Sequence, residues 1–569
     1  MRLRLLFAAV SPLLLCSCFS PGDGEPPPLN DLYFPTGLAL DAIPNADGTL
    51  SNKPEHLFIA SSDFDLQFRA SALAAYDLEA LERLVPANCN TDADCSDGKV
   101  CDNASMDPSY FCVEDPAAPC GSVGVHQPGD QLFYPGRCAS IDLSKAYPEL
   151  QGSTIIEDTV EIGAFATDVI FKAHQSTGAT GELEGRLFMP VRGDATLHWV
   201  DLDANGSHGH LLECGQSNTS DDSCDDNHRI GDDEDTESPN GLRQEPEPFA
   251  IAIDDPGSNV VITNQTTGSV SLYSNDFTPG IAPSLVSVLG GLPTAPVGIV
   301  AIPPPVPVPA NYEPGFLAVY ADAAEVDLLR VQQASSDPND PYTPRVLTHA
   351  NGVPITANSV GNDSRGIAID DTLRKADYAA CDAANCANLT ADALLACEQQ
   401  FASCFRAARQ PNVYLSSRAP ASLLVGSFIA DMSQLGTSEL PAFTSSIPLA
   451  LGPSRIVLGR VRVATSLSSG PGVVSDPLGN YVLEQRVFVV CFDSRKIYIY
   501  DPVRQVMDAI VSTGRGPYAL AIDELRGLAY IAHFTDSYLG VISLDQRFPR
   551  NYAAIVSSVG VPSAPRASK

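Results

Sequence analysis

The side chains best placed to act together in chemistry are oxygen ligands in one short segment. Asp201, Asp203 and Asn205 alternate along the chain and are followed by Gly206. This spacing is that of D-x-D-x-D/N-G loops, which present oxygens to Ca²⁺ around a sharp glycine turn. The closing acid, Glu213, lies one place late. Calcium binding by these four oxygen ligands is therefore one hypothesis, and an Asn-Gly turn between two strands is the other.

A recurring strand phrase indicates the elements that must position such residues. It reads PTGLALD at 35–41, EPFAIAID at 247–254, SRGIAID at 364–370 and GPYALAID at 516–523. Further β-rich runs follow each copy, so the unit has the form of a four-stranded sheet. Seven units can be counted within residues 32–563. Radial repetition protects the edges of such sheets, so the sequence predicts an all-β fold, a seven-bladed β-propeller.

The third, sixth and seventh units resemble the YVTN and NHL-like repeat families, which are WD40-like propellers. In those families a P-x-x-I-A-I-D strand leads to a Y-V-A-type strand and a V-S-V-I-D-type strand. The third, sixth and seventh units contain FAIAID, KIYIYD and YALAID, respectively. The resemblance implies the propeller fold and no particular activity, because such folds carry enzymes, binding proteins and scaffolds alike.

The inner strands themselves offer little for catalysis. None of the seven contains His, and the chain has neither a C-x-x-C-H haem motif nor a G-x-S-x-G elbow. The acids that close four inner strands recur at matching places, which favours a role in capping turns; they are Asp41, Asp254, Asp370 and Asp523. We therefore predict no catalytic residue and no cofactor apart from the possible calcium ion.

Fifteen cysteines in an exported chain predict disulfides that staple its interruptions. A Cys-rich insert at 88–138 contains six, whose pairing stays open: Cys89, Cys95, Cys101, Cys112, Cys120 and Cys138. Cys214 and Cys224 are expected to pin an acidic loop at 215–247. A helical hairpin at 376–409 is predicted to pair Cys381 with Cys404 and Cys386 with Cys397, because the last two cysteines of this segment lie two helical turns apart. Cys491 is expected to be buried and free.

The N-terminus indicates export. Arg2 and Arg4 precede a mostly apolar run that is too short to span a membrane, so residues 1–17 are predicted to be a signal peptide. The Leu-x-Ser-Cys ending resembles the lipobox of bacterial lipoproteins, which implies a lipid on the thiol of Cys18; an ordinary signal peptide is the alternative. Residues 18–31 are expected to be a flexible tether. Phe19 resembles an outer-membrane sorting signal.

Charge and architecture together bound the function. A formal net charge of -35 argues against nucleic acid as a partner, because phosphates require Lys and Arg. Loops on a rigid scaffold usually carry propeller function. We therefore predict a monomeric lipoprotein of the cell envelope that acts without catalysis as a platform for a protein partner. The alternatives are an enzyme of the lactonase or hydrolase type and a periplasmic sensor of small ligands. The Cys-rich insert and the helical hairpin are expected on one face of the ring, and the acidic loop on the other.

Overall fold

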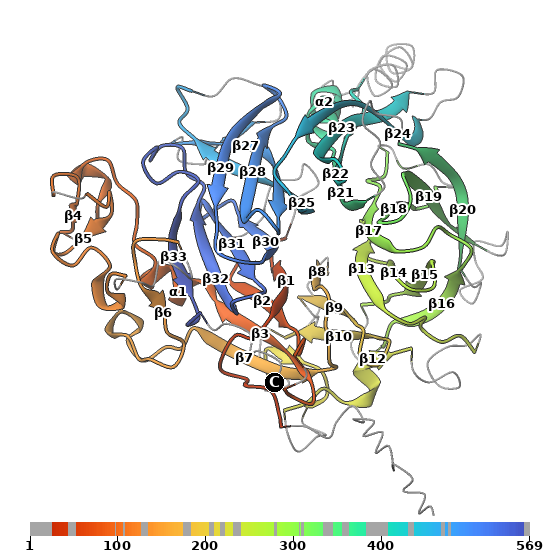
Figure 1. Cartoon of the computed structure of the whole chain (residues 1–569), viewed down its shortest axis with the longest axis horizontal. Helices are drawn as coiled ribbons and strands as arrows, with labels where there is room; N and C mark the ends of the chain where they lie inside the picture. Colours follow the sequence, from red (N-terminus) through yellow and green to blue (C-terminus); the bar gives the residue numbers. More distant parts are fainter. Residues whose placement is uncertain are drawn as a thin grey trace, which may run out of the picture.

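Seven sheets of four or five described strands are arranged around a central axis, so the predicted seven-bladed propeller is confirmed (Figure 1). The computed structural model describes residues 25–562, with its longest gaps at 44–52, 127–134, 175–183, 232–240, 334–344 and 383–407 and shorter gaps in other loops. The predicted signal peptide, Cys18, and most of the predicted helical hairpin lie outside the described residues.

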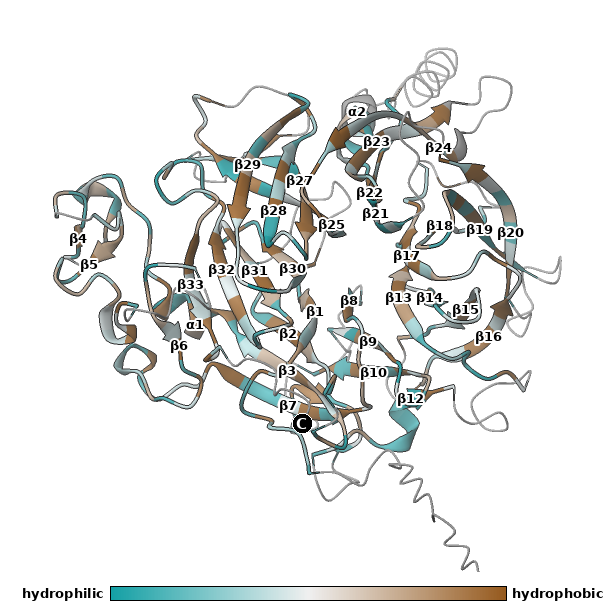
Figure 2. Ribbon diagram, in the orientation of Figure 1, coloured by the Kyte–Doolittle hydropathy of each residue, from teal (hydrophilic) through white to brown (hydrophobic). Residues whose placement is uncertain are grey.

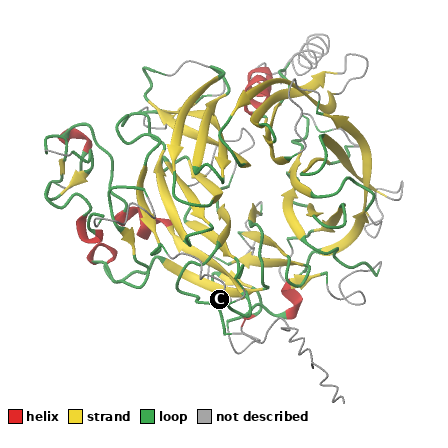
Figure 3. Cartoon of the chain, viewed as in Figure 1, coloured by secondary structure: helices red, strands yellow, loops and turns green. Residues whose placement is uncertain are grey.

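The strands of each blade run antiparallel from the axis outward (Figure 3). Blade 1 contains β1 (Pro35–Leu40), β2 (His56–Ser61), β3 (Ser71–Asp77) and β7 (Ile156–Ile162); blade 2 contains β8 (Ile170–Ala173), β9 (Gly185–Val191), β10 (Thr196–Leu202), β11 (Leu212–Glu213) and β12 (Arg229–Ile230); blade 3 contains β13 (Pro248–Ile253), β14 (Asn259–Asn264), β15 (Ser269–Ser274) and β16 (Ser284–Leu289).

The remaining blades follow the same order. Blade 4 contains β17 (Pro296–Ala301), β18 (Gly315–Tyr320), β19 (Glu325–Gln333) and β20 (Arg345–Pro354); blade 5 contains β21 (Ser364–Asp370), β22 (Asn412–Arg418), β23 (Ala421–Ala430) and β24 (Thr437–Pro448); blade 6 contains β25 (Pro453–Val463), β27 (Val482–Cys491), β28 (Lys496–Asp501) and β29 (Val506–Ser512), with β26 (Val474–Ser475) beside β27; blade 7 contains β30 (Pro517–Asp523), β31 (Leu528–His533), β32 (Tyr538–Ser543) and β33 (Ile555–Val559).

The recurring phrase corresponds to a bulged inner strand with a cap at its end. In six of the seven blades the inner strand's pairing shifts by one residue just after its first position, as between Pro35 and Gly37. Proline is tolerated at such a start because it has no N–H to contribute to the ladder. The acid at the other end accepts backbone N–H groups of the turn that follows, as Asp41 does from Glu55 at 2.9 Å and Asp523 from Arg526 at 2.9 Å. Asp254 and Asp370 do the same, so the predicted capping role is confirmed.

The core is divided among the interfaces between blades. Seven of the hydrophobic clusters each lie between two adjacent blades, including the cluster between blades 7 and 1 that closes the ring. Each sheet is thus apolar on both sides, and the blade strands carry much of the hydrophobic colour in Figure 2. Cys491 lies in the cluster between blades 5 and 6, where it is fully buried and free as predicted.

Blade 2 departs from the expected pattern. The apolar run AFATDVIF at 164–171 predicts its inner strand, but β8 begins at Ile170 and a single bridge joins Ala166 to β9. Its outer strand is split into β11 and β12, which pair with opposite ends of β10. The predicted acidic loop is therefore not only a solvated loop. Its described part supplies β12, and Ser223 pairs with Glu161 in the outer strand of blade 1.

The Cys-rich insert lies between β3 and β7 and docks on blade 7. It follows α1 (Leu78–Leu84) and includes β4 (Val100–Cys101) and β5 (Cys112–Val113), and beyond it β6 (Ser140–Ile141) pairs in parallel with β33. In Figure 1 this insert projects from the outer edge of the ring beside blades 7 and 1. Its disulfides are Cys89–Cys101, Cys95–Cys112 and Cys120–Cys138, and Cys214–Cys224 forms as predicted.

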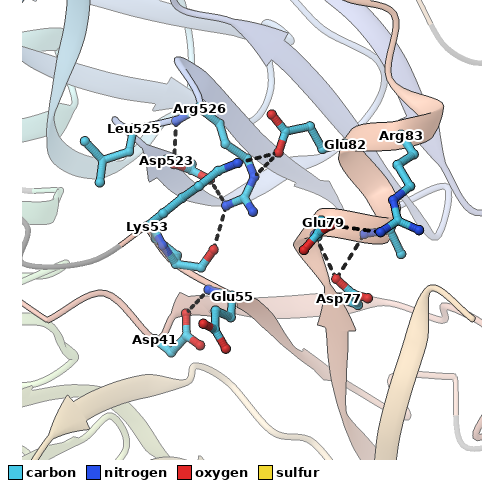
Figure 4. Close-up of polar contacts among 12 residues, drawn as sticks. Asp41, Lys53, Glu55, Asp77, Glu79, Glu82, Arg83, Asp523, Leu525 and Arg526 are labelled. Carbon is cyan, nitrogen blue, oxygen red and sulfur yellow. Dashed lines mark hydrogen bonds and ion pairs between the residues drawn. The ribbon is translucent and has the colours of Figure 1, made fainter. Parts of the chain in front are cut away.

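A buried arginine joins blade 7 to α1, the helix that precedes the insert (Figure 4). Arg526, only 3% exposed along its side chain, pairs with Asp523 at 2.9 Å and with Glu82 of α1 at 2.9 Å. It also donates to the carbonyl of Pro54 at 2.6 Å, and Lys53 pairs with Glu82 at 2.6 Å. Among the described residues, β6 is the strand that an earlier part of the chain adds to the sheet of blade 7, and β6 and these contacts contribute polar links that close the ring.

The blade order assigns the connections to two faces. Turns between first and second strands and between third and fourth strands emerge on one face, which we call the insert face, because it includes the Cys-rich insert and α2 (Thr372–Asp382). Turns between second and third strands and the links between blades emerge on the opposite face, which we call the tether face. Cys381 lies in α2, and Cys386, Cys397 and Cys404 lie outside the described residues, so their pairing stays a prediction.

Candidate functional site

The central channel is bridged at its tether-face end by an ion pair. Arg455, third residue of β25, donates from Nη1 to Oδ1 of Asp168 at 3.0 Å, and so links blade 6 to blade 2. Its guanidinium also lies 4.9 Å from the ring centroid of Tyr518 in β30. Burial opposes the charge of Arg455, but Asp168 outweighs burial and raises the pKa of the guanidinium.

At the insert-face end of the channel lies a polar cavity of about 220 Å³. It is formed where the inner strands of blades 5 and 6 end, beside the first turn of α2. Its lining combines acidic, basic and amide side chains with strand backbone: Pro303, Ile369, Asp370, Asp371, Thr372, Lys375, Leu458, Gly459, Arg460, Gln485 and Glu524. A cavity of this size and polarity fits a small, hydrogen-bonding ligand.

Most carboxylates of this cavity are bound by arginine or by backbone. Asp371 is held by Arg374, which also donates to the carbonyls of Pro303 and Pro304 at 3.1 and 3.2 Å. Glu524 accepts from the guanidinium and the backbone N–H of Arg460, both at 3.2 Å.

Burial governs the protonation of these acids. Burial raises the pKa of Asp370, although hydrogen bonds from Thr372 act in the opposite direction. It also raises the pKa of Asp371, although the charge of Arg374 acts in the opposite direction. Burial also raises the pKa of Glu524 although Arg460 opposes the effect. Within the described part of the chain, the Lys375 ammonium makes no hydrogen bond, so it is the cation of the cavity that is open to a ligand.

The four residues of the calcium hypothesis are placed only in part. Asp201 and Glu213 are paired across β10 and β11, Asp203 is buried just beyond β10, and Asn205 lies outside the described residues. Both carboxylate oxygens of Asp201 accept from the fully buried Arg186, at 2.6 and 3.1 Å. Burial nonetheless raises the pKa of Asp201. The calcium site stays a prediction, and Arg186 already neutralises one of its ligands.

Sequence reasoning did not single out Arg455, Asp168, Lys375 or Arg460. Asp168, Lys375 and the two arginines of β25 belong to three different blades, so no spacing in the sequence links them and they come together only when the ring closes. The one available hint is that the inner strand SRIVLGRV contains two arginines, Arg455 and Arg460, whereas the four quoted copies of the phrase contain one or none.

Comparisons with known proteins add little to this geometry. No protein-family model matches the chain, and no curated protein matches it. Among solved structures, a candidate 6-phosphogluconolactonase from Bacteroides uniformis is 11% identical, with a TM-score of 0.38 and coverage of 84% of this chain and 86% of that one. A functionally unknown protein from Desulfotomaculum acetoxidans is 9% identical, with a TM-score of 0.38 and coverage of 77% and 98%. At these scores the likenesses carry no argument, and the fold assignment rests on the strand pairing.

No helix in the described part of the chain is long and apolar enough to cross a membrane.

Proposed function

We propose that this protein is a lipoprotein of the cell envelope, held in the outer membrane by a lipid on Cys18, whose propeller serves as a binding platform without catalysis. The ring supplies rigidity, and the partner is a protein that contacts the modules added to the insert face. The lipid is the anchor, and the platform projects from the membrane surface into water.

The pairing of charges inside the channel is the observation that supports this function best. Arg455 and Asp168 bind each other at one end, and Arg460 and Glu524 bind each other at the other. A charged side chain that is held by a partner within the fold contributes to rigidity, and it is less free to transfer protons than an unpaired group. The additions that distinguish this chain from a plain propeller, namely the Cys-rich insert and α2, emerge instead on the insert face.

Fractionation of cells tests the anchor. The unmodified protein is expected in the outer-membrane fraction, and Cys18→Ala in the soluble fraction, while Ser20→Ala serves as the matched control and stays with the membrane. Retention of Cys18→Ala in the membrane would show that the lipid is not the anchor. Proteins captured with the detergent-extracted chain, and lost when residues 88–138 are deleted, would identify the partner of the insert face.

A second candidate function, sensing of a small ligand, is favoured by the cavity beside Lys375. Binding there should raise the melting temperature of the folded protein by mass action. Amino acids and sugar acids can be screened in this way with the purified chain. A shift that is lost in Lys375→Ala and kept in Lys145→Ala, an exposed lysine outside the cavity, would support the sensor. Hydrolysis of 6-phosphogluconolactone by the same preparation would contradict a function without catalysis.

A further inference from the structure

Aromatic side chains gather on the tether face beside the channel. The ring centroid of Phe64 lies 6.0 Å from that of Phe34, 6.5 Å from that of Phe165 and 5.1 Å from that of Phe534. Phe34 is buried and the other two neighbours are partly buried, whereas Phe64 is 59% exposed. The exposed ring of Phe64 extends the apolar cluster to the surface beside the channel, so these rings offer an apolar contact there. We call these four residues the aromatic cluster.

The N-terminal segment leaves the propeller at the same loop. The loop between β2 and β3 contains Phe64, Phe68 and Arg69. The backbone N–H of Arg69 donates to the carbonyl of Glu25 at 3.0 Å, and Glu25 forms a parallel bridge with Phe68. The ring of Tyr33 packs edge-on against Phe68 at 5.2 Å. The chain before Glu25 therefore starts from the tether face, next to the aromatic cluster.

The length of chain before Glu25 limits how far this face can stand from an anchor. Even fully extended, the residues from Cys18 to Glu25 span at most about 25 Å, at about 3.5 Å per residue. A lipid on Cys18 would thus hold the loop that carries Phe64 close to the bilayer surface. The insert face, on the opposite side of the sheets, would then point away from the membrane.

The charges around this face suit an approach to lipid. Although the chain is strongly acidic, three arginines on the tether face are paired with carboxylates: Arg192 with Glu247 at 2.8 Å, Arg418 with Asp493 at 2.9 Å and Arg515 with Asp536 at 2.5 Å. Paired charges are repelled less by an anionic bilayer surface than unpaired carboxylates are.

We propose that the aromatic cluster is a membrane-contact site, in which Phe64 enters the interfacial region of the bilayer that anchors Cys18. Phe side chains bury at this interface, and a tether raises the local concentration of the contact, which favours one orientation of the body. The proposal rests on the proposed lipid anchor. It adds that the propeller has a fixed orientation, with its insert face and the cavity beside Lys375 directed away from the membrane.

Fluorescence quenching in vesicles tests the orientation with the acylated full-length protein. The chain has one tryptophan, Trp199, which is buried, so the emission of a second tryptophan can be obtained by subtraction. Phe64→Trp is compared with Leu467→Trp, whose position is equally exposed at 61% but lies on the insert face. The vesicles contain phosphatidylethanolamine and phosphatidylglycerol, with or without dibrominated phosphatidylcholine.

The added emission of Phe64→Trp should be largely lost in brominated vesicles, and that of Leu467→Trp should be unchanged. Flotation of the same samples separates the two hypotheses. Protein that floats with the vesicles but shows no quenching at position 64, or equal quenching at both positions, overturns the membrane contact and leaves the anchor intact. A blue shift at position 64 without bromine quenching would mean that a protein covers the cluster, which also overturns the proposal. Protein that fails to float refutes the anchor and the contact together.

Discussion

Arg455 of blade 6 and Asp168 of blade 2 form an ion pair across the central channel, with 3.0 Å between Nη1 and Oδ1. Their side chains are 25% and 17% exposed, so the pair is largely shielded from water. Blades 2 and 6 are not neighbours in the ring, and their sheets share no hydrophobic cluster. The pair therefore acts as a strut that joins opposite sides of the propeller.

Removal of one partner of this strut should destabilise the protein. Arg455→Ala leaves Asp168 unpaired, and we expect the free energy of unfolding to fall by about 1–3 kcal/mol, below the full value for a buried pair because both groups keep some contact with water. Arg365→Ala is the matched control, because Arg365 also stands in an inner strand but pairs locally with Asp363.

Urea denaturation of the single variants and of Arg455→Ala combined with Asp168→Asn measures the coupling. We expect a coupling energy of at least about 0.5 kcal/mol, since the two residues are in contact. Additive effects would show that the pair is not a strut.

The propeller could be predicted because its unit is local. Proline at the bulged start, an apolar strand and a capping acid such as Asp523 lie within eight residues, and each satisfies a backbone requirement of its own blade. A proline at the start is not required, since β21 of blade 5 begins with Ser364. In blade 2 the ladder is interrupted between the single bridge of Ala166 and the start of β8 at Ile170, so the apolar run 164–171 predicts the inner strand too early in the chain.

The contacts that close and fill the ring were not predictable from local patterns. Arg455 and Asp168 are separated by 287 positions, and the amide of Asn551 in blade 7 reaches Asn88 of the insert across 463 positions. Polar groups of this kind have no periodicity, and their partners are set by which blades the ring brings together. The cavity beside Lys375 belongs to the same class, because strands or loops of four blades (4, 5, 6 and 7) and α2 contribute to it.

Ring closure should depend on Arg526. Arg526→Ala removes a nearly buried side chain and leaves Asp523 without its counterion, so we expect a loss of about 2–4 kcal/mol in the free energy of unfolding. Arg504→Ala is the control: Arg504 is 43% exposed and its nearest carboxylate oxygen, on Asp501, is 3.6 Å away, so its loss should be under about 1 kcal/mol. Guanidinium denaturation compares the two, and equal losses would mean that the contacts around Arg526 do not hold the ring closed.

Acid stability should be limited by His533. This side chain is fully buried, and burial lowers its pKa to about 3. An unfolded histidine has a pKa of about 6.5, so the unfolded chain binds a proton that the folded chain excludes between these values. The contribution of the neutral ring is complete above about pH 6.5 and is lost as the pH falls toward about 3. His533→Gln should therefore lose less stability than the unmodified protein over this window, as measured by urea midpoints.

His56 supplies a control of opposite sign. Burial disfavours its charged form, but hydrogen bonds to Asp41 at 2.8 Å and Glu157 at 3.0 Å outweigh burial and raise its pKa. Its contribution is present below about pH 6.5 and is lost as the pH rises through the folded pKa. His56→Gln should flatten the pH profile on that alkaline side and leave the acid side unchanged. A His533→Gln profile parallel to that of the unmodified protein would contradict the prediction for His533.

Thiol counting can test the disulfides that the structure leaves open. Eight cysteines are paired in the described residues, and Cys491 is free. If Cys381 pairs with Cys404 and Cys386 with Cys397, a soluble form that begins after Cys18 should expose one reactive thiol when it is unfolded without reductant; unpaired hairpin cysteines would give five. Before unfolding, Cys491 should not react, because burial raises its pKa to about 12 and the thiolate is the reactive form. Reaction with a thiol reagent at pH 8, with and without denaturant, gives both numbers, and Cys491→Ser should remove the single thiol that appears on unfolding.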